Sequence, residues 1–152
     1  MLNKYNRYNL LKLFLDSPTE KDFEREGLIK KQIKRKIPFY TAIRDNPNFI
    51  LYKKLSILFE LNDIGLIDYL WDKLSPESIV LYGSFVKGES IEDSDIDLFI
   101  LGKERKVDIT KFEDKLDKKI HLFFKESLKE IPNELKNNIL NGVILKGYLQ
   151  VF

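Results

Sequence analysis

The chain has 152 residues, of which 43% are hydrophobic and 33% charged, and its formal net charge at pH 7 is +2. This composition indicates a globular protein with one full domain, or with one domain of about 100 residues and a small additional module. No apolar run approaches the roughly 18 residues that span a bilayer, and no cysteine is present, which excludes membrane spans, disulfides and thiolate metal sites. The N-terminus lacks the apolar core of a secretory signal, so we expect a cytoplasmic protein without a membrane partner.

Charge is distributed unevenly along the chain. Residues 1–60 contain 13 Lys and Arg against 7 Asp and Glu, whereas residues 61–152 contain 13 against 17. Within the basic region, Asn46 and Pro47 form a turn and helix-start signal. We therefore predict a small basic module over residues 1–46 and a larger domain over residues 47–152.

The N-terminal module is predicted to be mostly helical, with one hairpin. Apolar residues are dense over residues 9–15, which favours a helix, and the proline that follows suits the first turn of a second helix over residues 19–26. Residues 28–32 and 37–43 are expected to be extended and to form a β-hairpin. The tip of the hairpin is basic and contains Lys34, Arg35 and Lys36.

After residue 47 the pattern changes to helices and strands in alternation. Helical spacing of apolar residues predicts helices over residues 49–59 and 66–74. Further along, strands are expected over residues 78–84, 94–101, 119–124 and 143–151, and helices over residues 110–116 and 133–141. This pattern predicts an α/β domain of the α+β kind. Its apolar C-terminal segment can pair at a sheet edge, either within the chain or between the chains of a homo-oligomer.

One motif points to a specific chemistry: Gly83 and Ser84 are followed after ten residues by Asp95 and Asp97. Because side chains alternate along a strand, a strand over residues 94–101 places both carboxylates on one face, roughly 6–7 Å apart. Two like charges within an apolar strand are costly unless a cation neutralises them. Mg²⁺ prefers one or two carboxylates together with substrate phosphates, so Asp95 and Asp97 are the predicted metal ligands.

The segment before the aspartates suits a nucleoside triphosphate. Gly83 lets backbone amides approach a ligand where the chain turns from a strand towards a helix, and such amides form an anion site. Ser84 adds a hydroxyl and Lys87 a positive charge within the same segment. Metal ions beside it would orient the triphosphate at its α-phosphorus, so the predicted reaction is nucleotidyl transfer, with pyrophosphate leaving.

Residues 78–101 resemble the signature of the minimal nucleotidyltransferases, small members of the DNA polymerase beta superfamily. Their motif is Gly-Ser, ten residues and Asp-x-Asp, and this chain matches it without a gap. The resemblance implies a nucleotidyltransferase fold with a mixed β-sheet flanked by helices, dependence on Mg²⁺, and ATP as the usual donor. It also implies transfer of AMP to a hydroxyl on a protein or small molecule. Members paired with HEPN-type toxins act as antitoxins by modifying the toxin, so such a toxin is a candidate partner.

The N-terminal module is similar to a shortened winged helix-turn-helix, whose wing opens at Gly27 and closes near Tyr40. Its wing carries a basic patch that can grip the phosphates of nucleic acid, although a solvated wing tip is an equal alternative. The patch consists of Lys30, Lys31, Lys34, Arg35 and Lys36.

The predicted strand over residues 119–124 departs from the pattern that the resemblance implies. Active members of the superfamily carry a third carboxylate there, whereas this chain has its only histidine, His121. Strand alternation places His121 on the opposite face from Ile120 and Leu122, towards the metal side. Three interpretations stay open: a general base for the acceptor hydroxyl, a ligand that favours Mn²⁺ or Zn²⁺, or a spectator in a decayed site. Asp108 is a weaker substitute for the missing carboxylate.

Three functions are compatible with these observations: an ATP-dependent nucleotidyltransferase, a catalytically decayed module that binds a partner protein, and a nucleic-acid-binding regulator. For the enzyme, the predicted catalytic residues are Asp95, Asp97 and His121, and the predicted nucleotide-binding residues are Gly83, Ser84 and Lys87.

Overall fold

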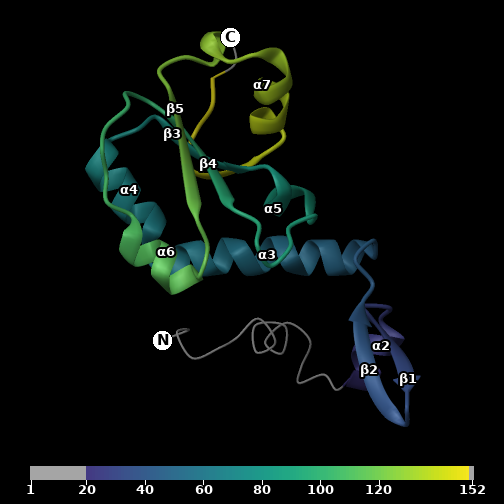
Figure 1. Ribbon diagram of the computed structural model, residues 1–152. Helices are drawn as coiled ribbons and strands as arrows, with labels where there is room; N and C mark the ends of the chain where they lie inside the picture. Colours follow the sequence, from purple (N-terminus) through teal and green to yellow (C-terminus); the bar gives the residue numbers. More distant parts are fainter. Residues whose placement is uncertain (1–19, 151–152) are drawn as a thin grey trace. The chain divides into compact units, whose positions relative to one another are not determined.

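The computed structural model describes residues 20–150, and the chain divides into two compact units (Figure 1). The division falls between Ser56 and Ile57, within helix α3 (Pro47–Asp63). The predicted domain boundary near residue 46 therefore stays a prediction, and the helix predicted over residues 9–15 lies outside the described residues. Within residues 20–150, no helix is both long enough and apolar enough to cross a membrane.

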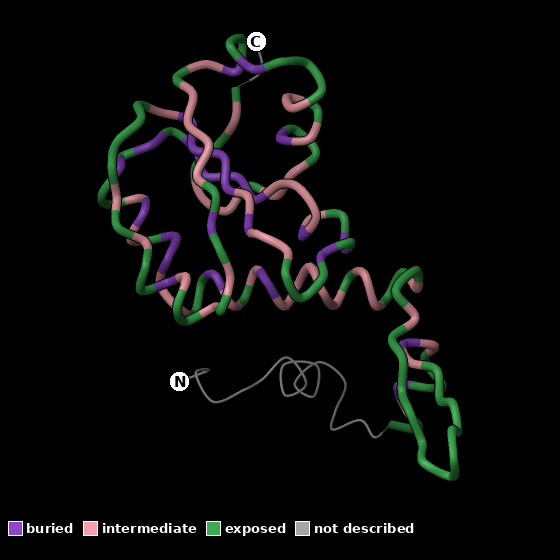
Figure 2. Tube along the Cα trace, in the orientation of Figure 1, coloured by how far each residue is buried: buried purple, intermediate pink, exposed green. Residues whose placement is uncertain are grey.

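A basic hairpin dominates the described part of the first unit. The elements are helix α2 (Glu20–Arg25) and the antiparallel strands β1 (Ile29–Lys34) and β2 (Ile37–Ala42). Arg35 and Lys36 alone connect the strands, and both have positive φ angles, of 50° and 66°. Two-residue turns of this kind normally carry Asn or Gly, because L side chains rarely adopt the conformation. Apart from the half-buried Ile29, every residue of the two strands is exposed (Figure 2).

One side chain ties the start of α3 to the end of α2. The Oδ1 of Asn46 accepts hydrogen bonds from the backbone N–H groups of Asn48 and Phe49, at 2.8 and 3.2 Å. Its Nδ2 donates to the carbonyl of Gly27 at 2.9 Å. Asn46 is therefore the N-cap of α3, and Pro47 follows at the first helical position, which the sequence signal predicts.

Replacing Asn46 by Ala should lower the free energy of unfolding by about 1–2 kcal/mol, because the cap and the bond to Gly27 are both lost. Asn46→Asp keeps the capping oxygen and loses only the donor, so its cost should be smaller. Urea denaturation followed by circular dichroism measures both variants. Equal losses for the two variants would contradict the capping role.

The second unit continues from the last turns of α3 into alternating helices and strands. Its elements are α4 (Leu66–Leu74), β3 (Ser78–Tyr82), α5 (Ser84–Lys87), β4 (Ile96–Leu101), α6 (Thr110–Leu116), β5 (Ile120–Lys125), the 3-10 helix η1 (Leu128–Glu130), α7 (Asn133–Leu140) and β6 (Val143–Gly147). The strands form one sheet in the order β5-β4-β3-β6, in which β4 and β5 are parallel and the other pairs antiparallel. The predicted mixed sheet flanked by helices is confirmed. The C-terminal strand β6 pairs with β3 within the chain.

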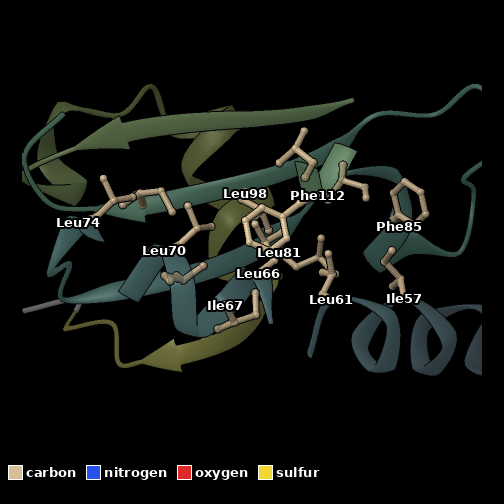
Figure 3. Close-up of a cluster of buried hydrophobic side chains, with 14 residues drawn as sticks. Ile57, Leu61, Leu66, Ile67, Leu70, Leu74, Leu81, Phe85, Leu98 and Phe112 are labelled. Atoms are coloured by element: carbon tan, nitrogen blue, oxygen red, sulfur yellow. The ribbon is translucent and has the colours of Figure 1, made fainter. Parts of the chain in front are cut away.

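Apolar side chains cover both faces of this sheet, which explains why β4 is apolar almost throughout. Ile96, Leu98 and Ile100 of β4 belong to a larger cluster, formed with residues of α3, α4 and α6 (Figure 3). The alternate residues of β4 point to the other face and enter a smaller cluster, whose buried members are Val80, Phe99, Leu101, Leu128, Ile131 and Ile139.

Candidate active site

Three polar side chains form one row across the sheet, on the face of the smaller cluster. Asp97 of β4 pairs with Tyr82 of β3 on one side and with His121 of β5 on the other. Exposure increases along the row, from the half-buried Tyr82 to His121, whose side chain is 63% exposed. The next row on this face is apolar and consists of Val80, Phe99 and Phe123. The polar row therefore lies where the buried part of this face ends.

His121 lies between the two aspartates of the motif. Its Nδ1 is 3.6 Å from Oδ1 of Asp97, and its Nε2 is 3.6 Å from Oδ2 of Asp95. These separations are longer than ordinary hydrogen bonds, so the imidazole is adjacent to both carboxylates and tightly held by neither. Asp95 precedes β4, which begins at Ile96, but its carboxylate lies on the same side as that of Asp97 because both face His121. The orientation expected for His121 from strand alternation is the one observed.

The backbone at Gly83 lies close to the carboxylate of Asp97. A Cβ at residue 83 would lie 2.5 Å from Oδ2 of Asp97, and its φ of +78° with ψ of −149° is a conformation essentially restricted to glycine. The carboxylate of Asp97 therefore packs directly against the backbone that leads into α5. Glycine is needed here for two reasons, backbone conformation and space.

The electrostatics of the row depend on partial burial. Burial raises the pKa of the Asp97 carboxyl above its ordinary value; His121 acts to lower this pKa, and the nearby charge of Asp95 raises it. Burial also raises the pKa of the Tyr82 phenol, with a further contribution from the charge of Asp97. Negative charge at Asp97 is thus disfavoured in the protein alone, which is the situation that a bound cation relieves.

Ser84 and Lys87 lie on α5, the short helix that follows Gly83. Ser84 is its first residue and is half-buried, whereas Lys87 is its last and is exposed. The helix ends at Gly88, whose N–H donates to the carbonyl of Ser84. The structure thus places Ser84 next to the residue that contacts Asp97. The nucleotide-binding roles of Ser84 and Lys87 stay predictions.

Asp108 lies on the other side of the sheet and does not join this row. Its Oδ1 accepts a hydrogen bond from the N–H of Thr110 at 3.0 Å, which lowers the pKa of Asp108, and its carbonyl accepts from the Tyr69 hydroxyl at 2.9 Å. Tyr69 packs on the larger cluster, on the face opposite to Asp97 and His121. Asp108 therefore stabilises the start of α6 and is no substitute for the third carboxylate.

Tyr82 is the member of the row that the sequence prediction missed. Its ring packs against the smaller cluster, while its backbone pairs with Asp97. The available signal was its position two residues after Val80 on the same strand, immediately before Gly83. Strand alternation alone would have put it on the face of Val80.

Asp95 and Asp97 have the donor chemistry of a magnesium site, since both present carboxylate oxygens on one side of the sheet. Within residues 20–150, no three His, Cys, Asp or Glu side chains are grouped to hold one metal ion. His121 faces Asp95 with Nε2 and Asp97 with Nδ1. It therefore does not direct one ring nitrogen at a metal ion that both carboxylates could bind. The donor chemistry of the two aspartates therefore suits a divalent cation such as Mg²⁺, to which other groups would have to supply the remaining ligands.

Comparison with known proteins gives one family match and two structural likenesses. Residues 65–149 match the model of the family "Polymerase beta, Nucleotidyltransferase", and this segment contains every residue of the row. A crystal structure of a toxin-antitoxin with AMP-PNP is similar at 26% identity and a TM-score of 0.45, over 58% of this chain and 75% of that one. A crystal structure of a mutant of the toxin-antitoxin MntA-HpeT is similar at 23% identity and a TM-score of 0.43, over the same shares of the two chains. No curated protein sequence matches this chain significantly.

Proposed function

The chain belongs to the polymerase beta nucleotidyltransferase family, and on this basis we propose that it transfers AMP from ATP to a hydroxyl group of a protein or small molecule. The observation that carries the proposal is the convergence of Asp95, Asp97 and His121 on one face of the sheet, with Asp97 against Gly83. Two carboxylates beside the turn at Gly83 can hold the divalent cation that this chemistry uses.

In the proposed mechanism, Asp95 and Asp97 would hold Mg²⁺, and the bound ion would supply positive charge beside the triphosphate and the attacking and leaving oxygens. The backbone at Gly83 and the hydroxyl of Ser84 bind phosphate oxygens, and Lys87 adds a positive charge. The acceptor oxygen bonds to the α-phosphorus, the bond from the α-phosphorus to pyrophosphate breaks, and His121 takes the proton of the acceptor hydroxyl.

The direct test is to incubate the full chain with ATP labelled at the α-phosphate and with Mg²⁺ or Mn²⁺, in the presence and absence of the protein encoded by the neighbouring gene. Label on a protein or small molecule, with release of pyrophosphate, would support the proposal. Failure to transfer label and failure to bind ATP with either metal would contradict it.

The acceptor that we propose is a partner protein, a HEPN-type toxin, which makes this chain its antitoxin. The support is the resemblance of residues 78–101 to the minimal nucleotidyltransferases. In a co-expression experiment, mass spectrometry should find AMP on the partner. Cell growth should show that the toxicity of the partner is relieved. If a variant with both Asp95 and Asp97 changed to Ala still relieves the toxicity, the chain acts by binding and not by transfer.

Replacing His121 by Ala should lower the rate of transfer by about 10²–10⁴-fold, the usual contribution of a general base. His121→Asp should retain more activity, because a carboxylate at this position can also accept the proton. Single-turnover rates at saturating ATP measure both effects, and ATP affinity is the control for the intact site. Wild-type rates in the Ala variant would identify His121 as a spectator.

Nucleic-acid binding is a second candidate function, favoured by the exposure of the basic hairpin. Lys30, Lys31, Lys34, Arg35 and Lys36 are all exposed on β1 and its turn. Exposed apolar side chains accompany them, among them Ile33, Phe39 and Tyr40. Positive charge beside aromatic rings suits a phosphate backbone and its bases.

Changing the three basic residues of the tip to Gln should weaken binding of a short duplex or single strand. It should also flatten the salt dependence, by a slope of about 0.7–0.9 for each phosphate that the protein no longer neutralises. The changed residues are Lys34, Arg35 and Lys36. A matched control changes the same number of exposed basic residues in the second unit, namely Lys103, Arg105 and Lys106. Fluorescence anisotropy at low salt measures both, and equal reductions in affinity would show that only net charge matters.

A further inference from the structure

Strand β5 forms one edge of the sheet and carries His121 as its second residue. In the order β5-β4-β3-β6, β5 pairs only with β4 among the described strands. His121 is in register with Asp97, so the polar row runs to this edge and ends there.

The backbone of β5 leaves hydrogen-bonding groups on its outer side. At the two ends of the pairing, the N–H of Ile96 donates to the carbonyl of Lys119 and the N–H of Gly102 to the carbonyl of Lys125, each at 2.8 Å. Odd-numbered residues therefore direct their backbone groups at β4, and the even-numbered residues direct theirs outwards. The outward residues are Ile120, Leu122 and Phe124.

Only the start of this outer edge has a partner within residues 20–150. The N–H of Ile120 donates to Oε1 of Glu113 at 2.9 Å. The N–H and carbonyl groups of Leu122 and Phe124 remain on the outer side, where no described strand pairs with them. An edge in this state is a template for another extended chain.

The two edges of the sheet differ in how they are protected. Proteins usually guard an edge with charges or bulges. At the other edge, β6 carries Lys146 and meets β3 with a register irregularity between Ile79 and Val80. On β5 the charged residue Lys125 stands at the C-terminal end, and the middle consists of Leu122, Phe123 and Phe124. The unprotected edge is thus the one that carries His121.

A strand added to β5 would continue the polar row. Neighbouring strands lie about 4.8 Å apart, and paired residues have Cβ atoms about 5 Å apart. The side chain opposite His121 would project on the face of Asp97, next to an imidazole that is itself 3.6 Å from both carboxylates. Its hydroxyl would then lie next to the imidazole of His121, on the face that carries the predicted metal ligands Asp95 and Asp97.

We propose that the edge of β5 binds an extended segment of a polypeptide acceptor by backbone pairing, and that the residue opposite His121 supplies the hydroxyl that receives the nucleotide. The inference rests on the proposed function and states how a protein acceptor would bind at that site. In the step itself, the hydroxyl oxygen bonds to the α-phosphorus, pyrophosphate leaves with the electrons of the broken bond, and the proton passes to His121. A second copy of this chain is no acceptor by way of β5, because residues 120–125 contain no hydroxyl side chain.

The test uses the full chain and the peptide acetyl-Thr-Val-Ser-Val-Thr-amide as an extended probe, with amide hydrogen exchange followed by NMR. With peptide at about ten times its Kd, exchange at the amides of Leu122 and Phe124 should slow about tenfold. The amide of Phe123, which faces β4, and the amides of β6 are internal controls. Because pairing uses alternate amides, N-methylation of the two Val residues or of the central Ser should abolish protection in only one of the two N-methylated peptides.

Three results would overturn the inference: no protection at millimolar peptide, equal protection by both N-methylated peptides, or concentration-dependent protection of Leu122 and Phe124 in the free protein. The last of these would mean that a second copy covers the edge. ATP binding is measured on the same sample. If ATP does not bind, the proposed function fails whatever the edge does. If ATP binds and the edge is not protected, only the present inference fails.

Discussion

Asp97→Asn should abolish nucleotidyl transfer, by at least about 10³-fold. The amide removes one of two carboxylates that face His121, and loss of several kcal/mol of transition-state stabilisation corresponds to this factor at about 1.4 kcal/mol per tenfold. Single-turnover transfer from ATP measures the loss. Asp93→Asn is the matched control, because Asp93 is an exposed aspartate in the loop before β4. A variant at residue 97 that retains wild-type turnover would contradict the assignment of the site.

The same substitution should make the metal-free protein more stable at neutral pH. Burial and the charge of Asp95 raise the pKa of Asp97, so its carboxyl binds a proton more tightly in the folded than in the unfolded protein. The stability contributed by this proton is fully present below the unfolded pKa and is lost as the pH rises through the raised folded pKa. An amide does not titrate in this range, so the Asp97→Asn variant does not undergo that loss.

The effect is tested by thermal unfolding in the presence of a metal chelator, at pH values from below the unfolded pKa of Asp97 to above its raised folded pKa. The wild-type protein should lose stability as the pH rises, and Asp97→Asn should flatten the curve, while Asp93→Asn should follow the wild type. Added Mg²⁺ should stabilise the wild type more than Asp97→Asn, because binding to the folded protein shifts the unfolding equilibrium. Parallel curves for Asp97→Asn and wild type would refute the account of the buried charge.

Gly83→Ala should lower transfer by about 10²-fold or more and should also destabilise the fold by about 1–3 kcal/mol. The new Cβ would lie 2.5 Å from Oδ2 of Asp97, so the carboxylate or the turn must move. A displacement of this kind misplaces one of the two predicted metal ligands. Transfer rates and urea denaturation measure the two effects separately.

Gly65→Ala is the control for a positive φ angle without a steric contact; the ψ angles of the two glycines differ, at 20° for Gly65 and −149° for Gly83. Gly65 has nearly the same φ, +75°, but no atom lies within 4 Å of where its Cβ would be. It should cost about 1–2 kcal/mol of stability through the left-handed conformation alone, without changing the rate of transfer by folded protein. If the two variants lost activity equally, the contact with Asp97 would not be the cause.

Local pattern predicted most helices and strands of the second unit and the main motif, but the strands predicted over residues 78–84 and 143–151 end earlier, at Tyr82 and Gly147. Periodicity of apolar residues predicted α6 over its observed range and β5 within one residue at each end, because each element contributes an apolar side chain to the larger cluster. It also predicted the hairpin of the first unit, but not the turn, since Lys34 pairs with Ile37 and only Arg35 and Lys36 connect the strands. The 3-10 helix η1 had no comparable signal over its three residues.

Spacing along the chain was enough to predict that Gly83, Ser84, Asp95 and Asp97 stand at the ends of neighbouring elements, because spacing and strand alternation are local properties. The row formed by Tyr82, Asp97 and His121, and the contact of Asp97 with Gly83, became visible only in the folded molecule. Strand order and register come from packing the two clusters on either face of the sheet, among residues far apart in the chain. No periodicity within a single segment records that packing.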